Sequence, residues 1–171
     1  MKQRILVAGI GNIFLGDDAF GVEVVRRLAD RPLPDEVRVV DYGIRGLDLV
    51  YALLDGWDAV ILIDAVPRGE PPGTLYLIEP EWDEIRGGEA NLAIDGHQMD
   101  PLRVLRLASG MGAQLAQTVI VGCEPSPLDG YDIQAGLSPA VQAALPRAVE
   151  MVAATVKRMF EEAAVMRVVI K

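Results

Sequence analysis

The stretch that most constrains the fold is the opening one, where an apolar run ends in two glycines and two adjacent aspartates soon follow. The run over residues 4–10 is typical of a strand that is buried on both faces. Gly9 and Gly11 would let the backbone leave this strand in a sharp turn, because glycine adopts conformations that a side chain forbids. Asp17 or Asp18 would then cap the following helix. The stretch therefore predicts a strand, a turn and a helix, with a carboxylate at the end of the strand.

The rest of the chain continues this alternation of strands and helices. Further strands are predicted over residues 36–41, 58–64, 74–78 and 117–123, and helices over residues 18–30, 46–54, 102–108 and 138–162. Such an order predicts a three-layer α/β/α fold: a mostly parallel, twisted sheet with helices on both faces. The tight connection before residues 74–78 favours at least one antiparallel strand. The length of 171 residues suits a single domain spanning residues 1–171.

Some local features carry their own expectations. Asp100 followed by Pro101 predicts the start of a helix, and Ser138-Pro139 predicts another, which Pro146 should disturb. Residues 80–96 contain three glycines and are expected to be irregular. The apolar tail over residues 165–170 could form a late strand or a docked arm. In the helix over residues 46–54, the face formed by Leu47, Val50 and Leu54 is expected to be buried.

Polar residues follow four of the predicted strands directly. They are Asn12 and Asp18 after the first strand, Asp41 after the second, Asp64 after the third and Glu124 after the last. Because parallel strands bring their carboxyl ends to one edge of the sheet, we expect a concentration of acid there. Ligands of doubly wound sheets bind at this edge, so it is the predicted site.

Composition excludes some classes of function. The formal net charge of −9 and the lack of a basic cluster argue against nucleic-acid binding. The single cysteine, Cys123, cannot form an internal disulfide and is expected to be a core residue in a reducing compartment. We find no signal-like start and no apolar run long enough to cross a membrane. The sequence predicts a soluble, cytoplasmic protein without membrane contact.

Dinucleotide binding is one hypothesis for the acidic edge. A glycine turn after the first strand and Asp41 after the second resemble the beginning of a nucleotide-binding sheet. However, Phe14 occupies the place of the third glycine, and Asp17 and Asp18 would repel a pyrophosphate. The pattern therefore disfavours this hypothesis.

A metal or acid–base site built from Asp18, Asp64 and the only histidine, His97, is a second hypothesis. Asp64 ends an aliphatic run, so its carboxylate should be partly desolvated and need a donor or a cation. Two oxygens and one imidazole suit borderline divalent ions such as zinc or nickel. Structural explanations stand beside it: Asp17 is better explained as a helix cap, Asp41 is equally well a turn residue, and a loop histidine is commonly a surface residue.

The same residues resemble, in order, the motif set of the hydrogenase maturation endopeptidases. The matching stretches are Gly9-Ile-Gly11-Asn12 with Asp17-Asp18 and Gly21, Asp41-Tyr-Gly43 with Gly46, Ile63-Asp64-Ala65, His97-Gln-Met99, Val121-Gly-Cys-Glu124-Pro and Gly136-Leu-Ser-Pro139-Ala-Val. Each motif alone is weak, but together they cover residues 4–155 in the family's order. The chain differs from the commoner Asp-Gly-Gly form by placing Tyr42 between Asp41 and Gly43.

The resemblance implies a specific function. Such enzymes are aspartyl-type endopeptidases that activate a [NiFe]-hydrogenase by removing the C-terminal extension of its large-subunit precursor after nickel insertion. It implies that Asp18, Asp64 and His97 contact the nickel and carry out catalysis. The nickel is expected to arrive with the substrate, and zinc or cadmium could take its place in crystals. Gly11, Asn12, Asp41 and Gly43 are expected to shape the pocket.

Two alternatives remain at this point. One is a peptidase that carries its own divalent metal, and the other is a non-catalytic α/β protein that binds a nucleotide or a partner chain. The resemblance favours neither, and the hydrogenase precursor is the expected partner.

Overall fold

The computed structural model of the protein describes residues 3–86, 100–115, 117–127 and 135–169, apart from the side chains of residues 84, 86 and 166–169. A short 3-10 turn, η1, lies between the first strand and the first helix. In chain order the elements are β1 (Ile5–Ile10), η1 (Gly16–Ala19), α1 (Phe20–Leu28), β2 (Val37–Gly43), α2 (Gly46–Leu53), β3 (Ala59–Ala65), β4 (Leu75–Ile78), α3 (Trp82–Arg86), α4 (Pro101–Gly110), β5 (Gln117–Cys123) and α5 (Pro139–Val169).

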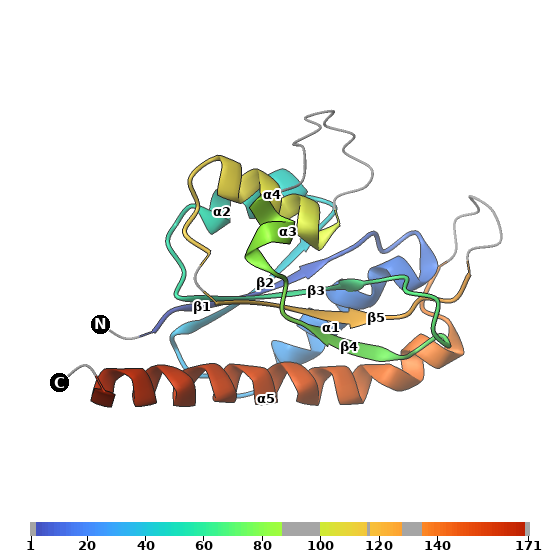
Figure 1. Ribbon diagram of the computed structural model, residues 1–171. Coiled ribbons are helices and arrows are strands. Elements are labelled where there is room, and N and C mark those ends of the chain that lie inside the picture. The colour runs from blue at the N-terminus through green and yellow to red at the C-terminus, as the bar shows by residue number, and fades with distance from the viewer. Residues whose placement is uncertain (1–2, 87–99, 116, 128–134, 170–171) are drawn as a thin grey trace.

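Within these residues, five strands form one sheet in the order β2-β1-β3-β5-β4 (Figure 1). The first four of these run parallel, and β4 pairs antiparallel with β5. This confirms the predicted mostly parallel sheet with an antiparallel strand. Because β2 and β3 pair with opposite sides of β1, the direction of winding reverses beside β1. Sheets of this kind bind ligands at that point, outside the carboxyl ends of the strands.

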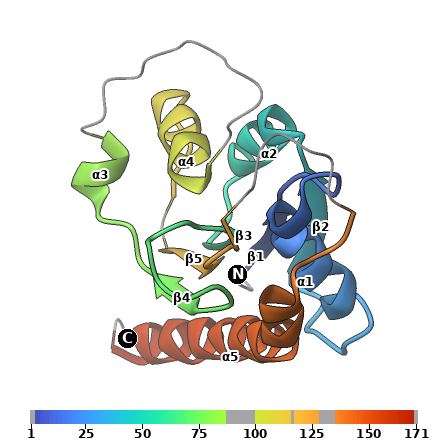
Figure 2. The same ribbon diagram turned by 90° about the vertical axis from the view of Figure 1, so that its right-hand side faces the viewer.

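Helices cover both faces of the sheet, which confirms the three-layer α/β/α prediction. Figure 2 shows α1 and α5 on one side and α2, α3 and α4 on the other. Each side has its own apolar core, because alternate residues of a strand point to opposite faces. Val7, Ile61 and Val121 pack with α1 and α5, whereas Leu6 and Leu62 pack with α2 and α4.

The central strands are buried along their whole apolar length. Every residue of β1, and every residue of β3 from Ala59 to Asp64, is buried. A strand covered by helices on both faces must be apolar at successive positions, which explains the uninterrupted aliphatic runs. Asp64 is the exception within β3, a carboxylate at the end of a buried strand.

Two segments differ from the sequence-based expectation. Residues 82–86 form helix α3 and are not irregular, while residues 87–99 lie outside the described part of the chain. The apolar tail is neither a strand nor an arm, because α5 continues to Val169 and passes through Pro146. Val141, Leu145 and Val152 recur at helical spacing on the core, and their burial offsets the one hydrogen bond that the proline removes.

The buried face of α2 also differs from the prediction. Leu49, Val50 and Leu53 face the core, whereas Leu47 and Leu54 are exposed. The helix is apolar on both sides, so periodicity alone did not identify its inner face.

Among the described helices, none is both long enough and apolar enough to span a bilayer.

Candidate active site

A glycine turn brings η1 back over the carboxyl end of the sheet. Gly11 has a positive φ of 132°, and a Cβ there would clash with the carbonyl oxygen of Asp18. A Cβ at Gly21 would clash with the carbonyl oxygens of Ile10 and Ile63. Only glycine allows such close backbone approaches. These two glycines therefore hold η1, which carries Asp18, against the ends of β1 and β3.

Asp18 is partly buried, and its carboxylate is fixed by the turn itself. Its Oδ2 accepts a hydrogen bond of 2.6 Å from the backbone N–H of Asn12. Burial raises the pKa of Asp18, and the hydrogen bond from Asn12 opposes part of that rise. The carboxylate is thus held at the edge of the sheet in a setting that disfavours its charge.

Asp64 is a buried acid. Only 6% of its surface is exposed, and among the described residues its Oδ1 accepts a hydrogen bond of 2.8 Å from the N–H of Ala65. Burial raises the pKa of Asp64 well above its ordinary value, and the nearby charges of Asp18 and Asp100 raise it further. By the alternation of β3, Asp64 lies on the side of the sheet that α2 and α4 cover.

Asp18 and Asp64 form the pair of acids that the structure brings together at the predicted edge. Two neighbouring carboxylates in a desolvated place favour a shared proton or a bound cation. Among the described residues, no group of three or more metal-ligating side chains occurs. His97, the third predicted ligand, lies outside the described residues. The described pair provides two oxygen ligands, which fits part of the predicted donor set.

Helix α4 begins beside this pair. Asp100 caps the helix, since its Oδ1 accepts the N–H of Arg103 at 2.9 Å and Pro101 follows at the first helical position. This confirms the predicted cap. The sequence did not indicate that Asp100 also lies close enough to Asp64 to raise its pKa, because that proximity depends on how α4 packs on the sheet.

The remaining pocket residues lie on the β1 and β2 side of the edge. The N–H of Gly11 donates to the carbonyl of Gly43 at 3.0 Å, and Asn12 Oδ1 accepts the N–H of Phe14 at 3.0 Å. The first contact joins the turns after β1 and β2, and the second shapes the turn after β1. That these residues shape a substrate pocket stays a prediction.

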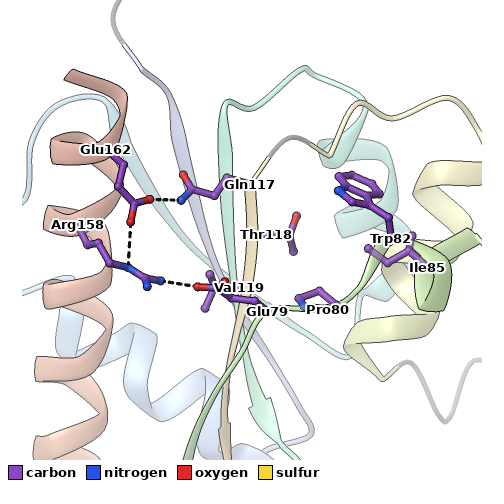
Figure 3. A pocket seen from close by; sticks show the side chains of 9 residues that line it. All are labelled: Glu79, Pro80, Trp82, Ile85, Gln117, Thr118, Val119, Arg158 and Glu162. Atoms are coloured by element: carbon purple, nitrogen blue, oxygen red, sulfur yellow. Dashed lines mark hydrogen bonds and ion pairs between the residues drawn. The ribbon is translucent and has the colours of Figure 1, made fainter. Parts of the chain in front are cut away.

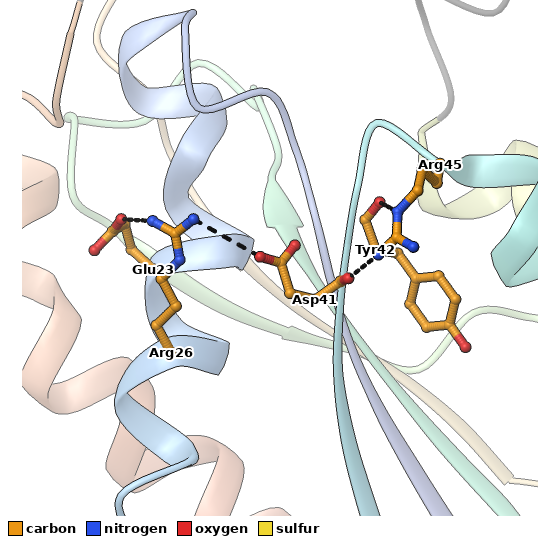
Figure 4. Close-up of polar contacts among 5 residues, drawn as sticks. All are labelled: Glu23, Arg26, Asp41, Tyr42 and Arg45. Carbon is orange, nitrogen blue, oxygen red and sulfur yellow. Dashed lines mark hydrogen bonds and ion pairs between the residues drawn. The ribbon is translucent and has the colours of Figure 1, made fainter.

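Asp41 has different surroundings from the acidic pair (Figure 4). Its carboxylate lies 3.9 Å from the guanidinium of Arg26, which also pairs with Glu23 at 3.0 Å. Its carbonyl accepts a hydrogen bond of 2.5 Å from Arg45. Asp41 therefore faces α1, whereas Asp64 lies on the α2 side of the sheet.

Asp17 does not cap a helix, which corrects the sequence-based interpretation. Neither η1 nor α1 has a side-chain cap, and Asp17 is buried with 4% of its surface exposed. Its two carboxylate oxygens accept the N–H groups of Ser126 at 2.8 Å and Ser138 at 2.6 Å. Asp17 thus ties η1 to the loop after β5 and to the start of α5, a role that only the tertiary structure reveals.

Glu124 lies at the end of β5 as predicted, but its carboxylate is engaged in structural hydrogen bonds. Its carboxylate accepts the N–H groups of Arg68 at 2.8 Å and Gly69 at 3.1 Å, and the hydroxyl of Tyr76 at 2.5 Å. The hydrogen bond from Tyr76 and the backbone donors lower the pKa of Glu124. Glu124 therefore holds the connection between β3 and β4 in place.

Cys123 is fully buried, as expected for a core residue. Burial raises the pKa of its thiol to about 12, so it remains protonated at neutral pH.

A cavity of about 310 Å³ lies at the other edge of the sheet, beside the first residues of β5 (Figure 3). Arg158 in its wall already pairs with Glu79 at 3.0 Å and Glu162 at 3.8 Å, and Gln117 donates to Glu162 at 2.6 Å. The length of β5 separates this cavity from the carboxyl edge by about 20 Å. Its two glutamates, Glu79 and Glu162, both pair with Arg158, unlike the acidic pair at the carboxyl edge.

The structure defines an α/β protein with a pair of acids, Asp18 and Asp64, at the carboxyl edge of a mostly parallel sheet. The family model described as hydrogenase maturation protease matches residues 22–155. The coenzyme F420 hydrogenase subunit delta of Methanothermobacter thermautotrophicus is 33% identical over 154 residues, which cover 87% of this chain and 92% of that protein.

Solved structures give the same result. The hydrogenase maturating endopeptidase HybD from E. coli matches with a TM-score of 0.72 and 29% identity, covering 91% of this chain and 93% of that one. The [NiFe] hydrogenase maturation protease HycI from Thermococcus kodakarensis matches with a TM-score of 0.66 and 25% identity, covering 91% and 94%. The chain belongs to the hydrogenase maturation proteases, and it is therefore a peptide-bond hydrolase by family.

Proposed function

We propose that this protein removes the C-terminal extension of a [NiFe]-hydrogenase large-subunit precursor after nickel has been inserted, and that Asp18, Asp64 and His97 recognise the nickel. The observation that carries the proposal is the buried carboxylate of Asp64 beside Asp18, at the edge where this fold binds ligands. Family membership supports the peptidase over a non-catalytic binding protein.

The electrostatics of the pair support a role in binding a cation. Among the described residues Asp64 accepts a hydrogen bond from the backbone N–H of Ala65, and its pKa is raised by burial and by Asp18. A divalent ion would supply a positive charge beside the pair, and it would favour the ionised form of Asp64 that burial disfavours.

His97 completes the proposed donor set. It precedes Asp100 by three residues, which an extended chain spans in roughly 10 Å, and Asp100 lies near Asp64. An imidazole added to two carboxylates makes a mixed nitrogen and oxygen set that suits a borderline ion such as nickel.

The chemistry follows from this placement. A cation held by Asp18 and Asp64 polarises a nearby peptide carbonyl or lowers the pKa of a bound water. The carboxylates orient the scissile bond and accept protons at the edge of the sheet. Since the nickel comes with the precursor, cleavage would report that nickel insertion is complete.

The test is a processing assay with matched substrates. The purified protein is incubated with nickel-loaded and with nickel-free precursor, and the mass of the large subunit is measured. We expect cleavage of the nickel-loaded form alone. Cleavage of both forms would support a peptidase that carries its own metal, and cleavage of neither would refute the proposal.

A variant at the histidine sharpens this test. His97→Ala should abolish processing with little change in thermal stability, whereas Asp35→Asn, at an exposed aspartate, should process normally. A large loss of stability in His97→Ala would indicate a structural role for the histidine.

A further inference from the structure

The outer face of α2 carries a stripe of exposed apolar side chains. Ile44, Leu47, Tyr51 and Leu54 have 68%, 45%, 60% and 38% of their surfaces exposed. Leu47, Tyr51 and Leu54 recur at intervals of three or four residues and therefore lie along one side of the helix, and Ile44 lies in the turn before it. We call these four side chains the α2 stripe; its helical part, from Leu47 to Leu54, extends about 10 Å.

The inner face of the same helix is also apolar, with Leu49, Val50 and Leu53 buried in the core. A helix that is apolar on both sides is normally covered on both sides. The polar residues at its start, Arg45 and Asp48, pair with each other at 3.7 Å beside the stripe. A continuous apolar surface with a polar rim is typical of a contact with another protein.

The α2 stripe begins near the candidate active site. The hydrogen bond from Gly11 to Gly43 places Ile44 beside the turn that carries Ile13 and Phe14. These two side chains are also exposed, by 40% and 62%. Asn12, which precedes them, donates to the carboxylate of Asp18. Exposed apolar side chains therefore occur both in the turn next to Asp18 and along α2.

We propose that the α2 stripe, together with Ile13 and Phe14, docks an apolar surface of the folded hydrogenase large-subunit precursor next to its C-terminal extension. The inference rests on the proposed function and names where the substrate is held. A protease that cuts one protein needs contacts away from the scissile bond, because the bond itself is common to all chains.

The position of the surface favours the precursor over a second copy of this chain. A polypeptide cut at Asp18 and Asp64 would lie next to the turn that carries Ile13 and Phe14, because Asn12 of this turn donates to the carboxylate of Asp18. A second copy seated on the same surface would cover this edge and block the substrate. The occupant that serves the reaction is therefore the substrate protein.

The test measures docking apart from catalysis. Nickel-free precursor is titrated against the wild type, Leu47→Glu, Leu47→Lys and Leu47→Met, with Val165→Glu as a control at a helical side chain that is 64% exposed on α5. We expect both charged variants at Leu47 to weaken binding about tenfold or more. Equal losses with Glu and Lys at Leu47 would show that any charge disrupts the contact, whatever its sign. Leu47→Met and Val165→Glu should bind within about twofold of the wild type, because the first keeps the contact apolar and the second places the charge on another helix.

Cleavage kinetics with nickel-loaded precursor provide the second readout. Leu47→Glu should raise KM about tenfold at unchanged kcat, because the residue contacts the substrate far from the bond that is cut. If the wild type cleaves and the Leu47 variants bind and cleave equally well, docking is refuted while the proposed function stands. If the wild type binds through the stripe and cleaves nothing, docking stands and the proposed function fails.

Two further results would overturn the docking proposal. A fall in Tm of Leu47→Glu by more than about 3 °C would show that the stripe packs against this chain's own residues. A dimer in sedimentation experiments that Leu47→Glu dissociates would show that a second copy is the occupant.

Discussion

Asp64 and Glu124 are two buried carboxylates at the ends of the neighbouring strands β3 and β5, and their surroundings are opposite. Glu124 accepts backbone N–H groups, among them those of Arg68 and Gly69, and the hydroxyl of Tyr76, and its pKa is lowered. Among the described residues Asp64 accepts the N–H group of Ala65, and its pKa is raised by burial and by Asp18. Similar burial thus gives an anchored structural acid in one place and an unstable charge in the other.

The comparison teaches that the end of a strand does not by itself make an acid functional. The number of donors that the tertiary structure supplies decides whether the carboxylate is already satisfied. An acid that lacks donors can bind a proton or a cation from outside, and an acid that has them cannot do so without losing structure.

The largest expected contrast is in activity. Asp64→Asn should lower the rate of precursor cleavage by about 100-fold or more, because it removes a charge that the reaction uses. Glu124→Gln should retain the rate within a few-fold when it is assayed well below its Tm. Cleavage followed by mass spectrometry measures both, and equal losses in the two variants would abolish the distinction between the acids.

Asp17 extends the comparison to a second anchored acid. Asp17→Ala should lower the free energy of unfolding by about 2 to 4 kcal/mol, because the buried N–H groups of Ser126 and Ser138 lose their acceptors. Chemical denaturation measures the change, with the exposed Asp35→Ala as the control. A variant as stable as the wild type would show that this tie contributes nothing.

The stability of Glu124→Gln tests the anchor itself. Loss of the charge weakens the bonds from Arg68, Gly69 and Tyr76, so Tm should fall by roughly 5 °C. Asp64→Asn should show no fall, because burial disfavours the charged form of Asp64 and the amide that replaces it carries no charge. Differential scanning calorimetry at neutral pH compares the two, and a larger loss in Asp64→Asn would contradict the contrast.

The smallest expected effect is in the pH dependence of stability. The folded state raises the pKa of Asp64, so above the ordinary aspartate pKa of about 3.9 it binds more protons than the unfolded chain. The free energy of unfolding therefore decreases as the pH rises through that range. Glu124 has the opposite sign: its stabilisation is present above about pH 4.3 and is lost as the pH falls.

Denaturation of the wild type and both variants between about pH 3 and about pH 8 measures these slopes. In Asp64→Asn the free energy of unfolding should no longer show the decrease that Asp64 causes as the pH rises. In Glu124→Gln it should decrease less than in the wild type as the pH falls. The pKa of Asp18 is also raised, so in both variants Asp18 still makes the free energy of unfolding decrease as the pH rises. Unchanged slopes would mean that neither acid differs between the folded and unfolded states.

Local patterns predicted much of the fold. The aliphatic runs of β1 and β3 predicted strands covered on both faces, and Asp100-Pro101 predicted the start of α4. The helix start depends on residues adjacent in the chain, and the strands depend on aliphatic residues, which are usually buried. The two faces of α2 and the length of α5 were not predicted, because several equally apolar choices were available and packing selected among them.

The order of the motifs in the sequence determined the family, and the strand ends determined which edge of the sheet would carry the acids. The tertiary structure alone decided which acids stay unsatisfied, because the donors to Asp17 and Glu124 come from segments far away in the chain. It also joined Asp18 to Asp64 through close backbone packing at Gly11 and Gly21. Hydrogen-bond donors and desolvation depend on three-dimensional neighbours, and a sequence read in order does not contain them.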